Sequence, residues 1–158
     1  LAQSPSVAIA SFNELGVRKM SLLSIVVVDD DRSFLDAMKA MLKRIGFQNI
    51  YAYDNVEDAW SHIQRDAPSL IISDWNMDPI NGYEFLLMMK FEEHSRNIPF
   101  IMNTANMAED YWVKAIGAGA DDFLVKPFSY ADLKETIEIA LGKILKEDSR
   151  KSHLRLVS

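Results

Sequence analysis

The sequence predicts an α/β fold in which five parallel strands alternate with five helices. From Ser21 onward, short apolar runs alternate with longer segments whose apolar residues recur every three or four positions. This alternation is typical of βαβ units rather than of hairpins. The chain has 158 residues, 49% of them hydrophobic, which suffices for one full core and is short for two. We therefore expect a single doubly wound domain.

The first strand is the apolar run Ile25 to Val28. A helix is expected next, because apolar residues recur at helical spacing and Gly46 stands where a helix would stop. Six residues mark its apolar stripe: Phe34, Leu35, Met38, Met41, Leu42 and Ile45. The second strand, near Asn49 to Tyr53, follows at once.

The second helix is expected to begin after an Asn55 cap and to end before Pro68. Its apolar stripe consists of Val56, Ala59, Trp60 and Ile63. The third strand includes Leu70 to Ile72, and the third helix runs from about Asn81 to Glu93.

The fourth strand is expected within Ile98 to Thr104. Asn106, with Glu109 three residues later, forms a capping signal that predicts the start of the fourth helix, and Gly117 and Gly119 close it.

The fifth strand is the short run Asp122 to Val125. Ser129 with Asp132 gives another capping signal, for a last helix that ends near Lys146. We interpret residues 1–20 as a flexible N-terminal extension, 21–147 as the folded domain and 148–158 as a flexible tail.

Composition excludes several classes of function. Seventeen basic and twenty-three acidic residues give a net charge of −6, which argues against direct nucleic acid binding. The longest apolar stretch, Leu22 to Val28, is far shorter than the roughly 20 residues of a membrane helix, so no membrane insertion is expected. The absence of cysteine excludes disulfides and thiolate chemistry and fits a cytoplasmic location.

Four of the apolar runs end on residues suited to binding phosphate or a metal. Asp29 and Asp30 follow the first strand, Asp74 ends the third, Thr104 the fourth, and Lys126 follows the fifth. The carboxyl ends of parallel strands share one edge of the sheet, where open α/β folds bind ligands. These side chains are therefore expected to converge.

The three carboxylates predict a cation site. Like charges about 4 Å apart repel by roughly 4 kcal/mol at an effective dielectric near 20, so Asp29, Asp30 and Asp74 favour a bound cation. Hard oxygen ligands suit Mg²⁺ or Mn²⁺, whereas zinc prefers histidine or cysteine. The histidines lie away from the strand ends and are interpreted as surface residues: His62, His94 and His153.

A carboxylate beside such a cation can attack a phosphoryl group, because the metal neutralises charge on both reactants. Asp74 is the expected nucleophile, since it ends the central strand. Lys126 supplies a point charge for a phosphate oxygen, and Thr104 donates a hydroxyl hydrogen bond to another.

The order and spacing of these residues resemble the receiver domain of two-component response regulators, and most closely its stand-alone CheY-like chemotaxis type. Four segments carry the resemblance: VVDD at Val27–Asp30, ISDWNM at Ile72–Met77, NTA at Asn103–Ala105 and KPF at Lys126–Phe128. It covers about Leu22 to Leu145. The resemblance implies a flavodoxin-like fold with strand order 2-1-3-4-5.

The resemblance also implies residue roles. Asp74 would accept phosphate from a phosphohistidine on a sensor histidine kinase or a histidine phosphotransfer protein. Asp30, Asp74 and the Asn76 carbonyl would bind Mg²⁺ directly, with Asp29 acting through water. Thr104 and Lys126 would contact the phosphoryl group, with a cis peptide joining Lys126 to Pro127.

The same resemblance implies how phosphorylation would be signalled to a partner. Phe123 would turn inward as Thr104 moves toward the phosphate, and Asn76 and Asn106 would tune dephosphorylation. The surface of the fourth helix, fifth strand and fifth helix, where Trp112 is a candidate contact, would signal to a separate output protein. One departure is visible, because Asp78 replaces the proline usual four residues after the phosphoacceptor.

The favoured function is thus a phosphoacceptor switch rather than an enzyme, with self-catalysed phosphotransfer and autodephosphorylation. A phosphohydrolase resembling haloacid dehalogenases is an alternative, although such enzymes carry an Asp-x-Asp motif on the first strand. A receiver-like interaction module that works without phosphorylation is a further alternative.

Overall fold

The computed structural model describes residues 20–106 and 108–142, and its centre is a five-stranded sheet. The strands are β1 (Ser24–Val28), β2 (Asn49–Tyr53), β3 (Leu70–Asp74), β4 (Phe100–Thr104) and β5 (Asp122–Val125). All neighbouring pairs are parallel, in the order β2-β1-β3-β4-β5. The predicted fold class and strand order are confirmed.

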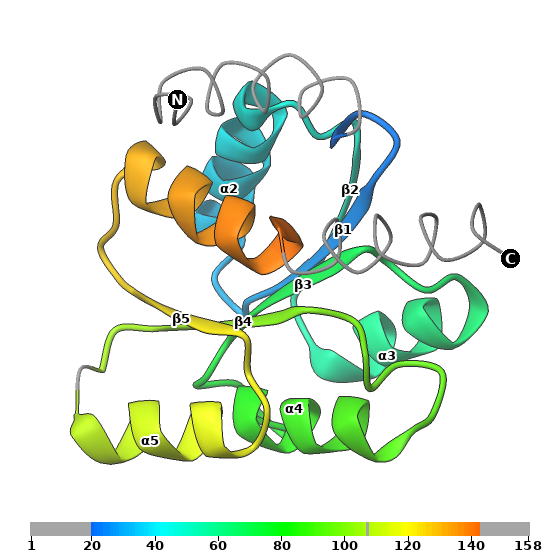
Figure 1. Cartoon of the computed structure of the whole chain (residues 1–158), viewed down its shortest axis with the longest axis vertical. Helices are drawn as coiled ribbons and strands as arrows, with labels where there is room; N and C mark the ends of the chain where they lie inside the picture. The colour runs from blue at the N-terminus through cyan, green and yellow to red at the C-terminus, as the bar shows by residue number, and fades with distance from the viewer. Residues whose placement is uncertain (1–19, 107, 143–158) are drawn as a thin grey trace, which may run out of the picture.

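Helices cover both faces of this sheet, as Figure 1 shows. Their bounds are α2 (Arg32–Ile45), α3 (Val56–Arg65), α4 (Gly82–Phe91), α5 (Glu109–Gly117) and, for the last described helix, residues 130–142. In Figure 1, α2 and the last helix lie on one side of the sheet, and α3, α4 and α5 lie on the other. The three inner strands β1, β3 and β4 are therefore buried on both faces, which explains their mostly apolar sequences.

The core divides into two clusters because successive side chains along a strand point to opposite faces. Val27, Ile72 and Ile101 pack on the side of α2 and the last helix. Val26 and Ile71 pack on the side of α3, α4 and α5.

Side-chain caps explain most of the helix starts. Asp31, Asn55 and Asn81 each accept a hydrogen bond from a backbone N–H in the first turn of α2, α3 and α4, respectively. Ser129 and Asp132 cap each other before the last described helix, as predicted. The expected end of that helix near Lys146 lies outside the described residues, as do the N-terminal extension through residue 19 and the C-terminal tail.

The predicted start of α5 is wrong. The N-cap is Ala108, and no side chain caps this helix. The Asn106 carboxamide oxygen instead accepts a hydrogen bond from the Ala108 N–H at 2.9 Å, and so closes a turn before the helix.

The surface assignment of His62 is also wrong. His62 lies on the buried stripe of α3, with 8% of its surface exposed. Its Nδ1 is 2.6 Å from the Tyr53 hydroxyl, which lets a polar ring be buried with a partner. His94 is exposed as predicted, and His153 lies outside the described residues.

Candidate functional site

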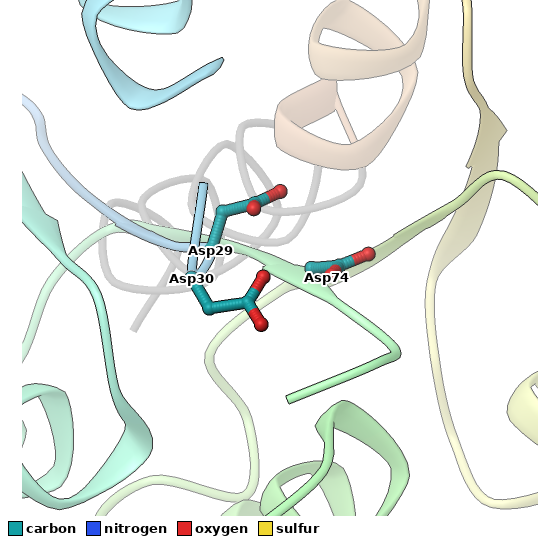
Figure 2. A group of neighbouring side chains, drawn as sticks. All are labelled: Asp29, Asp30 and Asp74. Carbon is teal, nitrogen blue, oxygen red and sulfur yellow. The ribbon is translucent and has the colours of Figure 1, made fainter. Parts of the chain in front are cut away.

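The carboxyl edge of the sheet brings Asp29, Asp30 and Asp74 together. Because β1 and β3 are parallel neighbours with Val28 opposite Ser73, the residues that follow lie side by side. One carboxylate oxygen from each aspartate lies within 4.8 Å of the others (Figure 2). Asp29 and Asp74 are buried and Asp30 is exposed, so the cluster opens to solvent on one side.

Lys126 reaches this cluster from the far side of β4. Its Nζ lies 2.6 Å from Asp29 Oδ2 and 3.4 Å from Asp74 Oδ1. The ammonium also sits 4.1 Å from the centre of the Phe34 ring, a cation–π contact with α2. The Lys126–Pro127 peptide is cis, which confirms the prediction.

The electrostatics of the cluster are unbalanced without a further cation. Burial, and then repulsion from Asp29, raise the pKa of Asp74 to about 6, although Lys126 opposes the rise. One ammonium thus does not fully compensate two buried carboxylates. An added cation would favour the ionised form of Asp74.

The donor set fits a hard divalent cation. The three clustered ligand residues are all carboxylates, which Mg²⁺ and Mn²⁺ prefer. Asp29 Oδ1 already accepts a hydrogen bond from the Asp31 N–H at 2.9 Å, which fixes the orientation of that carboxylate. Asn76 is exposed two positions after Asp74, and the expected binding by its carbonyl stays a prediction.

Thr104 ends β4 one residue beyond the position paired with Asp74. Its side chain is fully buried, and its Oγ1 accepts a hydrogen bond from the Asn106 N–H at 3.1 Å. The Lys126 N–H donates to the Thr104 carbonyl at 2.8 Å, so β4 and β5 hold these two residues in a fixed relation.

The expected signalling residues lie beyond the carboxylate cluster. Phe123 is partly buried against the core on the side of α5 and pairs with Met102 of β4. Trp112 is 52% exposed on α5. The proposed roles of Phe123, Trp112 and Asn106 stay predictions.

Sequence reasoning missed the role of Gly82. Its N–H donates to the Trp75 carbonyl at 2.8 Å, and a Cβ at this position would collide with the carbonyl oxygen of Asp74. A glycine directly after the helix cap Asn81 was the available signal. The Trp75 ring stacks on Tyr83 of α4 at 5.5 Å, which further ties this helix to the end of β3.

This chain is similar in sequence and in structure to known proteins. Residues 25–138 match the family model described as response regulator receiver domain. Chemotaxis protein CheY1 of Helicobacter pylori is 30% identical over 121 residues, which cover 76% of this chain and 98% of that protein.

Two solved structures give a similar result. Chemotaxis protein CheY4 of Vibrio cholerae superposes with a TM-score of 0.71 at 25% identity, over 75% of this chain and 98% of that one. The receiver domain of the sensor histidine kinase PA1611 from Pseudomonas aeruginosa superposes with a TM-score of 0.69 at 25% identity. The match covers 76% of this chain and 98% of that one. That receiver was solved with a magnesium ion coordinated in its active site cleft.

Proposed function

The chain belongs to the response regulator receiver family, and on that premise we propose that Asp74 accepts a phosphoryl group from a phosphohistidine. Receivers of this family are signalling switches. The observation that carries the proposal is the meeting of Asp29, Asp30, Asp74 and Lys126 at one edge of the sheet.

The proposed step is a displacement at phosphorus. An ionised Asp74 oxygen attacks, the bond between phosphorus and the donor imidazole nitrogen breaks, and that nitrogen keeps the electron pair and takes a proton. Lys126 is 3.4 Å from Asp74, close enough to move onto a phosphoryl oxygen attached there. Thr104, at the neighbouring strand end, would donate its hydroxyl to another oxygen.

Asp29, Asp30 and Asp74, with the carbonyl of Asn76, would hold Mg²⁺, or Mn²⁺ in its place. The bound cation would neutralise charge on both reactants. Support comes from the all-oxygen carboxylate cluster and from the magnesium ion in the PA1611 receiver. Asp78 is an exposed carboxylate in the following loop and is not part of this carboxylate cluster.

The proposed output is a change of surface read by a separate protein. Thr104 would move toward the phosphoryl group and Phe123 would turn inward, while Asn76 and Asn106 would tune the loss of phosphate. The receiving surface would include exposed apolar residues of α5 and the last described helix: Trp112, Val113 and Ile139. A sensor histidine kinase or a histidine phosphotransfer protein would be the donor, in the cytoplasm.

The family model and the relatives reported above match response regulator receivers, which favours the receiver over the haloacid dehalogenase alternative. Within the described residues, no helix has the length and apolar character needed to cross a bilayer.

Incubation with acetyl phosphate and Mg²⁺ tests the proposal, read by intact mass. We expect the wild-type protein to gain one phosphoryl group, and Asp74→Asn or removal of Mg²⁺ by a chelator to abolish the gain. Asp78→Asn is the matched control and should keep it, because Asp78 is exposed four residues further along the chain. A folded wild-type protein that never gains the mass would instead favour an interaction module that works without phosphorylation.

A further inference from the structure

A buried amide with no described partner lies beside the phosphoacceptor. Asn103 is 1% exposed, and neither its Oδ1 nor its Nδ2 has a hydrogen-bond partner among the described residues. It pairs with Asp74 on β3 and with Leu124 on β5. A buried polar group without a partner destabilises a fold by about 1 to 3 kcal/mol. The presence of an amide rather than an apolar side chain at this position therefore needs an explanation.

Asn103 faces the same side of the sheet as Asp74 and Lys126. Ile101, two residues before it, packs in the cluster on the side of α2, and alternate residues of a strand share a face. Asp74 follows Ile72 of the same cluster by two residues. The Lys126 ammonium lies over Phe34 of α2, which places it on this side too.

The strand order makes Lys126 pass over the end of β4. The lysine follows β5, and its ammonium contacts Asp74 at the end of β3 and Asp29 after β1. Because β4 lies between β5 and β3, the side chain crosses the strand end where Asn103 is the last residue facing this side. The lysine side chain therefore crosses the end of β4 on the face of the sheet that carries Asn103.

A cation on the carboxylates would compete with this lysine. The two oxygens that hold the ammonium belong to Asp29 and Asp74, which are members of the carboxylate cluster. A divalent cation bound to that cluster would also repel the ammonium. The displaced ammonium needs an acceptor, since a partly buried charge without one is costly. The carboxamide oxygen of Asn103, on the same face of the sheet as the Lys126 ammonium, is a neutral hydrogen-bond acceptor.

We propose that Asn103 is a positioning residue for Lys126: its carboxamide oxygen accepts a hydrogen bond from the ammonium once a divalent cation displaces it from Asp29. This inference rests on the proposed function. It adds Asn103 to the residues of that site, which the sequence pattern did not include. Asn103 would stabilise the position from which Lys126 meets an incoming phosphoryl group.

The test is a titration with Mg²⁺ alone, followed by tryptophan fluorescence. Asn103→Leu, similar in volume, should weaken Mg²⁺ binding about tenfold, because a hydrogen bond to a charged group is lost. The same substitution should raise the melting temperature without Mg²⁺ by about 2 to 4 °C, since it removes the unpartnered amide. Met102→Leu, on the same strand but in the other core cluster, is the matched control and should change Mg²⁺ affinity less than twofold.

A double-mutant cycle separates positioning from packing. In a Lys126→Met background, Asn103→Leu should no longer change Mg²⁺ affinity, because the amide acts through the ammonium. Asn103→Val guards against a local packing defect of the leucine variant and should show the same loss of affinity.

Three results would overturn the inference while leaving the proposed function intact: unchanged Mg²⁺ affinity in both Asn103 variants, an equal loss in the Lys126→Met background, or a lower melting temperature without Mg²⁺ in both variants. A wild-type protein that binds no Mg²⁺ would overturn the proposed function and this inference together.

Discussion

The two edges of the sheet use polar groups in different ways. At the amino edge they are paired: the Asp121 carboxylate accepts the Phe100 N–H at 2.9 Å, and the buried Ser95 hydroxyl donates to the Met89 carbonyl at 2.8 Å. At the carboxyl edge, Asp29 and Asp74 share one ammonium, and the Asn103 amide has no described partner. The first edge pairs its buried polar groups, whereas at the second the repulsion between Asp29 and Asp74 and the unpartnered amide both cost stability.

The largest change in stability is expected at the carboxyl edge, where the first turn of α4 packs against the end of β3. Gly82→Ala should lower the free energy of unfolding by about 3 kcal/mol or more, because its Cβ collides with the Asp74 carbonyl oxygen. Urea unfolding measures this. Gly117→Ala is the control and should change stability by less than about 0.5 kcal/mol, since nothing lies within 4 Å of its Cβ position. Similar losses in both variants would contradict the close approach of α4.

A smaller change in the free energy of unfolding, an increase rather than a decrease, is expected on substitution of Asp74. Without metal at pH 7, Asp74→Asn should raise the free energy of unfolding by about 1 to 3 kcal/mol. The pKa of Asp74 is about 6 in the folded protein against an ordinary value of 3.8, so the folded state binds more protons between these values. The contribution of Asp74 to the stability of the wild type therefore falls as pH rises through this window, and the advantage of the variant should disappear below about pH 4.

Urea unfolding from pH 7 down to below pH 4 measures this difference between the variant and the wild type. Asp121→Asn at the amino edge is the control and should bring no gain, because that carboxylate already accepts a backbone hydrogen bond. A loss of stability in Asp74→Asn at pH 7, or a gain independent of pH, would contradict the contrast between the edges.

The smallest effect is expected at the amino edge. Ser95→Ala should cost about 1 kcal/mol, because it leaves the Met89 carbonyl without its hydroxyl donor in a buried place. Ser61→Ala removes a comparable hydroxyl bond to the Glu57 carbonyl on an exposed helix surface, where water can replace it. Thermal unfolding of the two variants should therefore differ, and equal melting temperatures would argue against an amino edge stabilised by buried pairing.

The sequence predicted much of this molecule because its patterns are local. Apolar runs and helical stripes predicted the strands and helices, and the polar strand ends predicted that Asp29, Asp74 and Lys126 would converge. Contacts between distant residues were beyond these patterns. The burial of His62 depends on the Tyr53 hydroxyl, nine residues away, and the Lys126 ammonium contacts Asp74, 52 residues away.

The start of α5 shows a second limit of local patterns. Asn106 has the right side chain and spacing for a capping box with Glu109, yet it bonds the Ala108 N–H instead. The competing turn uses the same carboxamide, and propensity alone does not choose between the two.

The hydrogen bond between the Gly82 N–H and the Trp75 carbonyl also limits how this chain can change in length. The two backbone groups lie 2.8 Å apart and close the ends of the loop formed by residues 76–81. An added or deleted residue there would have to be accommodated with both ends fixed, next to Asp74 and the first turn of α4. In a library of single-residue insertions, functional members should therefore be depleted across residues 76–81.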